Sequence, residues 1–139
     1  MSRLQLIIVF GLFTTSAAFG QPAALIDDPG LNETDLDGQS VNITLTDETF
    51  ADLTLDPGNF NLDNAPGGLT IESFTSVTTT SAVVNLAFTP GDFDANVTDF
   101  SISIDNSELT VTPAGVLTTN VITISADIES ASISNPGLN

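Results

Sequence analysis

Apolar and polar residues alternate with a period of two over several short segments of the chain. Val41, Ile43 and Leu45 are separated by polar residues, as in a strand with one buried face. No segment shows a sustained apolar period of 3.6 residues, and the abundant Thr, Val and Ile favour strands over helices. The alternation predicts four clear strands, over residues 41–45, 82–88, 100–104 and 122–128.

Weaker alternation, and the turns between segments, complete the predicted fold. Pro-Gly pairs such as Pro29-Gly30 and Pro57-Gly58 suit the central positions of type II turns. We also expect a β-bulge near Ser73 and Phe74. About seven short strands predict an all-β fold, specifically an immunoglobulin-like Greek-key β-sandwich. A small closed barrel is the alternative. The weaker predicted strands are residues 60–62, 69–77 and 109–112.

Residues 1–20 have the order of features found in a cleavable signal peptide. Arg3 supplies positive charge, residues 4–13 form an apolar run too short to span a bilayer, and Ala18 and Gly20 are small residues at the cleavage site. We expect cleavage before Gln21 and a secreted or cell-surface location. The predicted domains are a signal peptide at 1–20, a sandwich at 21–130, and a linker or the start of a second repeat at 131–139.

The acidic charge of the chain argues against two classes of binding partner. The chain has 18 acidic residues against one basic residue, and no His or Cys, so its formal net charge is −17. Arg3, the only basic residue, belongs to the predicted signal peptide, so the mature chain has no cationic side chain to bind phosphate groups. Nucleic acid and anionic membranes are therefore poor partners for it. Crowded carboxylates predict raised pKa values in the folded state, and stabilisation by salt or divalent cations.

A nine-residue segment near the start of the sandwich is echoed at the end of the chain. Residues 24–32 and 131–139 are identical at six of nine positions, at an offset of 107 residues. This spacing is about the length of one immunoglobulin-like module, so it predicts the start of a second copy. The alternative is two similar turn sequences that arose by chance.

Several of these segments also resemble a known family. Residues 30–38, 41–51 and 64–71, and later segments at 86–94, 100–104 and 117–124, are similar to bacterial immunoglobulin-like repeats. The resemblance covers most of residues 24–128. It implies a β-sandwich that occurs in tandem in secreted or surface adhesin-type proteins, without catalytic residues of its own.

The residue types after position 20 argue against catalysis. Without His, Cys, Lys, Arg or Tyr, no pairing of nucleophile and base such as Ser-His can form. Paired carboxylates can hydrolyse glycosides, but the Trp and Tyr side chains on which sugars usually stack are missing. We therefore expect a protein that is not an enzyme and requires no cofactor.

Calcium is the best candidate ligand, since Ca²⁺ prefers carboxylate and amide oxygens. The candidate metal ligands are Asp92, Asp94, Asn96 and Asp99. Their spacing begins like an EF-hand loop, but Val97 and Ser103 stand where that loop needs Gly and Glu. A looser site remains, helped by Asp35 and Asp37 or by Asp27 and Asp28 if these loops converge. The alternative is a set of solvated acidic turns.

Three functions fit this sequence. The first is a non-catalytic structural or adhesive module whose partners are neighbouring modules or a surface ligand, either protein or glycan. The second is a subunit of an extracellular filament that donates residues 131–139 to a neighbouring sheet edge. The third is a carbohydrate-binding module, which the absence of Trp and Tyr disfavours.

Overall fold

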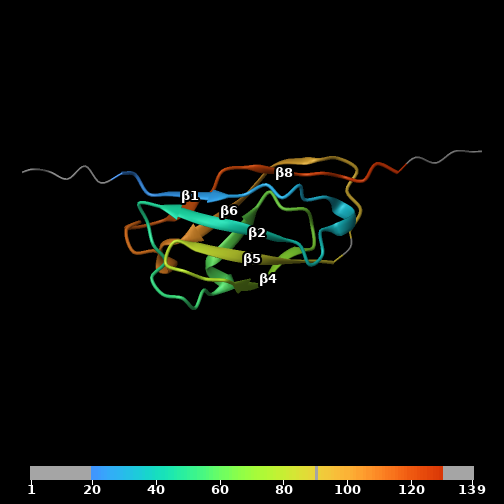
Figure 1. Cartoon of the computed structure of the whole chain (residues 1–139). Coiled ribbons are helices and arrows are strands. Elements are labelled where there is room, and N and C mark those ends of the chain that lie inside the picture. The colour runs from blue at the N-terminus through green and yellow to red at the C-terminus, as the bar shows by residue number, and fades with distance from the viewer. Residues whose placement is uncertain (1–19, 90, 130–139) are drawn as a thin grey trace, which may run out of the picture.

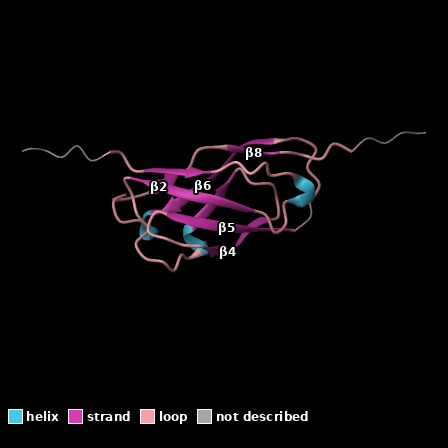
Figure 2. Ribbon diagram, viewed as in Figure 1, coloured by secondary structure: helices cyan, strands magenta, loops and turns pink. Residues whose placement is uncertain are grey.

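The computed structural model describes residues 20–89 and 91–129, and in this part the chain is all-β (Figures 1 and 2). Most of the predicted signal peptide and the predicted linker at 131–139 lie outside the described residues. Within the described part, no helix has the length and hydropathy needed to cross a membrane. The strands are β1 (Ala23–Ile26), β2 (Ser40–Thr46), β3 (Phe60–Asp63), β4 (Leu69–Thr75), β5 (Ser81–Phe88), β6 (Val97–Asp105), β7 (Val116–Thr118) and β8 (Ile122–Ile124). Three short 3-10 turns are η1 (Glu33–Asp35), η2 (Pro57–Asn59) and η3 (Asn106–Glu108).

The strands form two antiparallel sheets. One has the order β1-β2-β5-β4, and the other has the order β3-β6-β7, with β8 also paired to β6. A single apolar cluster contains buried residues from both sheets. The prediction of an all-β, two-sheet protein is therefore confirmed, with eight strands in the described part rather than about seven.

Strands β2 and β5 show why simple alternation identified the first sheet. Val41 pairs with Val84 and Ile43 pairs with Ala82, and all four side chains are buried. The polar residues between them in β2 face solvent. This register puts one apolar face of the sheet on the core, as the sequence predicts.

Strand β6 lies at the centre of the second sheet. Phe100, Ile102 and Ile104 are fully buried, and Ser103 is also buried, with its hydroxyl bonded to Thr118 at 2.8 Å. The hydrogen-bond ladder along β6 is interrupted between its partners β7 and β8. There the Thr119 hydroxyl accepts a hydrogen bond from the Ile102 backbone N–H at 3.0 Å. The last two strands thus continue each other along one side of β6.

Two strand predictions near the end of the chain are wrong. Residues 109–112 form no strand beyond one bridge from Leu109 to Phe50, because the backbone N–H groups of residues 110–112 point at the Glu48 carboxylate. The strand predicted at 122–128 ends at Ile124, and Ile128 is 79% exposed instead of facing the core. Conversely, β1 and β7 were not predicted.

The bulge and turn predictions had mixed outcomes. The register of β4 against β5 shifts between Ile71 and Ser73, which confirms the predicted bulge. Gly30 has a φ of 81°, as a type II turn requires. Pro57-Gly58 belongs instead to η2, where the Asp56 carboxylate accepts from the Gly58 backbone N–H at 2.9 Å.

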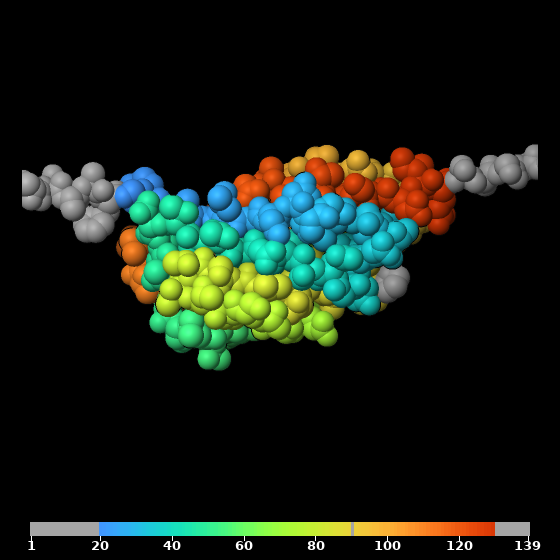
Figure 3. Space-filling view, viewed as in Figure 1, coloured from blue at the N-terminus to red at the C-terminus, as the bar shows by residue number. Residues whose placement is uncertain are grey.

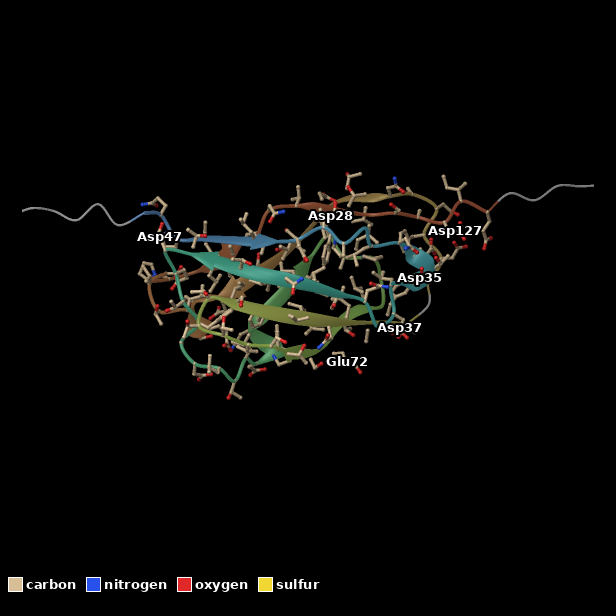
Figure 4. The ribbon with its side chains drawn as sticks, in the orientation of Figure 1. Asp28, Asp35, Asp37, Asp47, Glu72 and Asp127 are labelled. Carbon is tan, nitrogen blue, oxygen red and sulfur yellow. The ribbon has the colours of Figure 1, made fainter. Side chains whose placement is uncertain are left out.

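The first and last described residues lie at opposite ends of the sandwich (Figures 1 and 3). Gly20 lies beside Asp47, and Figure 4 places Asp47 at the end opposite Asp35 and Asp127. Glu129 lines the same hollow as Glu33, at the end that carries Asp35. The chain therefore enters at one end and leaves at the other.

Candidate functional site

The four predicted calcium ligands do not all belong to one loop. Asp92, Asp94 and Asn96 precede β6, whereas Asp99 lies within β6 itself. The Asn96 side-chain oxygen already accepts from the Ala126 backbone N–H at 2.9 Å. Asn96 therefore ties the loop to the segment that follows β8.

The acidic side chains at this end surround an open hollow of about 400 Å³. Asp92 lines it together with Glu33, Asp37 and Glu129. Asp27, Asp28 and Asp35, which the sequence also suggested as helpers of the calcium loop, do not line it. Asp94 and Asp99 are exposed and do not line the hollow. Among the described residues, no three acidic side chains gather closely enough to hold a metal ion.

Two carboxylates at this hollow fix the loops in place. Glu33 Oε1 accepts from the Phe93 backbone N–H at 3.0 Å, and its Oε2 accepts from the Asp127 backbone N–H at 2.9 Å. Asp37 accepts from the Phe88 backbone N–H at 3.0 Å. These carboxylates therefore have a structural role that needs no cation.

Calcium binding thus stays a prediction, and thermal melting measures it. If the four residues bind Ca²⁺, millimolar CaCl₂ raises the melting temperature to a plateau that NaCl of equal ionic strength does not reach. Asp94→Asn should remove that difference, because it removes one of the charged ligands. Asp94 is exposed, and within the described residues its side chain makes no hydrogen bond, so the substitution should not disturb the fold. An equal rise in both salts would show charge screening alone and would discard the site.

At the opposite end of the sandwich, the Glu48 carboxylate is buried, with 3% of its surface exposed. Its Oε1 accepts from the backbone N–H groups of Thr49, Thr110 and Val111 at 2.8–3.0 Å. Its Oε2 accepts from the backbone N–H and the hydroxyl of Thr112, both at 2.7 Å. One carboxylate thus organises the loop that follows η3.

These hydrogen bonds shift the Glu48 pKa in the direction opposite to the one expected from the sequence. Burial raises the pKa, but hydrogen bonds from the Thr112 hydroxyl and from the backbone of Thr49, Val111 and Thr112 outweigh it and lower the pKa from 4.5 to about 2. Hydrogen bonds from the Ser107 backbone and hydroxyl also lower the pKa of Asp105. For these two groups the predicted rise is wrong.

A second buried carboxylate belongs to Glu108. Its Oε1 accepts from the Asp56 backbone N–H at 3.1 Å and from the Asn59 side-chain amide at 2.7 Å. Throughout the described residues, no buried side-chain N or O atom lacks a hydrogen-bond partner. Sequence reasoning missed the roles of Glu48 and Glu108, because their partners lie about fifty to sixty positions away and leave no local signal.

A second hollow, of about 410 Å³, lies where the chain enters the sandwich. Leu45, Thr80 and Val111 line it together with Gly20 and the stem of Glu48. The Glu48 carboxylate is already engaged by the 110–112 loop, and Asp47 is the other acidic residue at this hollow.

Comparisons of the chain with models of protein families, with curated proteins and with solved structures found no match. The function is therefore inferred from the residues and their arrangement.

Proposed function

We propose that the chain is a non-catalytic extracellular module with an immunoglobulin-like fold, which serves as a spacer or adhesive unit of a secreted or cell-surface protein. The strand order supports this fold. Read in chain order as A to G, β1-β2-β5-β4 and β3-β6-β7 correspond to the A-B-E-D and C-F-G sheets of a constant-type immunoglobulin domain, with β8 as the second half of G.

The observation that carries the functional proposal is the position of the two ends. The polypeptide enters the sandwich beside Asp47 and leaves it beside Glu33, at the opposite end. Modules joined in tandem would therefore lie end to end, and each would extend the protein by its full length. A tension applied through such a chain runs from β1 to the segment after β8.

Direct hydrogen bonds join the first part of the sandwich to its last part, on either side of β8. Asn120 accepts from the Ile26 backbone N–H at 2.7 Å and donates to the Ile26 carbonyl at 3.1 Å. Further along, Ser125 pairs in parallel with Asn32, through bonds that involve the Leu31 carbonyl and the Glu33 N–H. When the two ends are pulled apart, all of these hydrogen bonds are sheared at the same time along the strand direction. Such an arrangement resists force, as a spacer under tension requires.

The partners proposed for this module are neighbouring modules or a surface ligand, either protein or glycan. Its extracellular location follows from the predicted signal peptide. A sugar ligand would have to bind without Trp or Tyr, because the sequence contains neither.

The spacer proposal is tested by stretching single molecules from their two ends. We expect Asn120→Ala to lower the unfolding force clearly, because it removes both side-chain bonds to Ile26 from the load path. Its equilibrium cost is only about 1 kcal/mol, since Asn120 is exposed.

Asn85→Ala is the matched control. Asn85 donates to the side chains of Ser73 and Thr75 within the first sheet, away from the segments that join the two ends. It should leave the unfolding force near the wild-type value. Equal forces for wild type and Asn120→Ala would count against a load-bearing role.

A further inference from the structure

The segment that is echoed at the end of the chain has a defined place in the fold. Ala24 and Ile26 are the buried residues of β1, and Leu31 is buried where the chain crosses toward the second sheet. Between them, Gly30 has a φ of 81°. Asn32 then caps η1, with its side-chain oxygen accepting from the Asp35 backbone N–H at 3.2 Å.

The repeated residues coincide with these structural positions. The types of all three buried residues recur in the sequence, as Ala131, Ile133 and Leu138, and Gly137 and Asn139 are identical to Gly30, which has a positive φ, and to Asn32, which caps η1. The sixth identity is proline. A chance similarity has no reason to select the buried positions.

The three positions that differ are all exposed. They are Leu25, Asp27 and Asp28, which become Ser132, Ser134 and Asn135. Asp28 accepts from the Gly30 backbone N–H at 3.0 Å, and asparagine carries the same side-chain oxygen for that turn. Only the contact of Asp27 with Asn42 has no close equivalent in the repeat.

Residues 131–139 cannot take this place in their own module. Its β1 position is already filled by residues 23–26, paired with β2. Moreover, Ala24 pairs with Leu45 near the entry end, whereas Glu129 lies at the exit end. Two residues beyond Glu129 extend the chain by only about 7 Å.

Another copy of the chain in solution is a poor acceptor as well. Its β2 edge is covered by its own β1, which buries the same side-chain types. Displacing that strand would gain no burial and would cost the entropy of association. A following module that has no other first strand offers an open edge.

We propose that residues 131–139 are the first strand and crossover of a following module of the same fold, joined head to tail to this one. The inference rests on the proposed function as a structural module and names its partner. Ala131, Ile133 and Leu138 take the core positions of Ala24, Ile26 and Leu31. Few residues are then left to separate the modules.

A fusion chain tests this inference. In the fusion protein, a first copy (residues 21–139) is joined directly to a second copy that begins at residue 33 (residues 33–139). Residues 131–139 of the first copy then occupy the sequence position of residues 24–32 of the second copy. We expect two folded copies by calorimetry. Ile133→Asp should lower the melting temperature of one copy by ~10 °C or more, and should leave the single chain 21–139 unchanged.

Ser132→Asp is the matched control, since position 132 corresponds to the exposed Leu25, and it should change neither copy much. A second measurement uses Ser132→Cys with Thr44→Cys in the second copy, because Leu25 pairs with Thr44. The Cα separations of antiparallel pairs, about 4.5–5.5 Å, allow a disulfide. The sequence contains no other cysteine.

A second copy that stays unfolded, or a fusion chain indifferent to Ile133→Asp, would overturn the inference. So would polymers of the single chain that disappear when residues 131–139 are deleted, since the strand would then be donated between chains. These outcomes leave the spacer proposal standing, because the Asn120→Ala measurement tests that proposal separately.

Discussion

Replacement of Phe100 by alanine is expected to lower the free energy of unfolding by ~3–5 kcal/mol. Phe100 is the largest of the fully buried side chains, and it lies on β6 opposite Ile122 of β8. Truncation leaves a cavity between two sheets whose backbones are held by their ladders, so the space cannot collapse fully. The loss is a large part of the ~5–15 kcal/mol that stabilises a typical domain.

Thermal and urea unfolding followed by far-ultraviolet circular dichroism measure this loss, because the chain has no Trp or Tyr for fluorescence. We expect the melting temperature to fall by about 15 °C or more. Phe93→Ala is the control, since Phe93 is half-buried and meets Phe88 edge-on at 6.3 Å between ring centroids. Its expected cost is about 1 kcal/mol. Similar losses for the two variants would contradict the described core.

The strands that the sequence predicted well are those whose burial pattern is local. In β2 and β5, every second side chain is buried against the opposite sheet, so large apolar residues recur with a period of two. In β6 the same period is set by Phe100, Ile102 and Ile104, although the serines between them are also buried. Strand β1 escaped prediction because its four residues, Ala-Ala-Leu-Ile, are all apolar although Ala23 and Leu25 are exposed. A short edge strand of this kind carries no period-two signal.

The incorrect strand at 109–112 has a different origin. Its alternation is real, but the backbone N–H groups that a ladder would need are taken by Glu48, more than sixty positions earlier in the chain. Nothing in the local pattern reveals that partner. Contacts between distant segments therefore limit what periodicity alone can predict.

The candidate calcium site shows the same limit. The spacing of Asp92, Asp94 and Asn96 suggested one loop, and Asp92 lines the same hollow as Asp37. Asp99, however, lies inside β6, and Asn96 is engaged by the chain after β8. Spacing along the sequence does not show which oxygens the fold has already used.

Replacement of Glu48 by glutamine is expected to lower the free energy of unfolding by about 3 kcal/mol at pH 7. The fall of the Glu48 pKa from 4.5 to about 2 is a difference of about 2.5 units, and each unit corresponds to about 1.36 kcal/mol. Glutamine keeps the shape of the side chain. It presents an N–H₂ group where Oε1 or Oε2 accepts hydrogen bonds, so at least one backbone donor of the 110–112 loop loses its partner.

The pH dependence gives the sharper measurement. Because the folded-state pKa of Glu48 lies below the unfolded value, its contribution is complete above about pH 4.5 and is lost as the pH falls from there toward about 2. The wild type should therefore lose stability in acid more steeply than Glu48→Gln. The difference in the free energy of unfolding between the two proteins should therefore shrink from about 3 kcal/mol at pH 7 to a small remainder near pH 2.

Glu108→Gln provides the matched control for this effect. Glu108 is also buried, but only its Oε1 accepts hydrogen bonds, from Asp56 and Asn59. Glutamine can keep that oxygen in place and turn its N–H₂ group to the other side, so we expect a loss below about 1 kcal/mol at pH 7. If Glu48→Gln instead followed the wild-type curve in parallel down to pH 2, the hydrogen bonds between the Glu48 carboxylate and the 110–112 loop would not be the acid-sensitive contact.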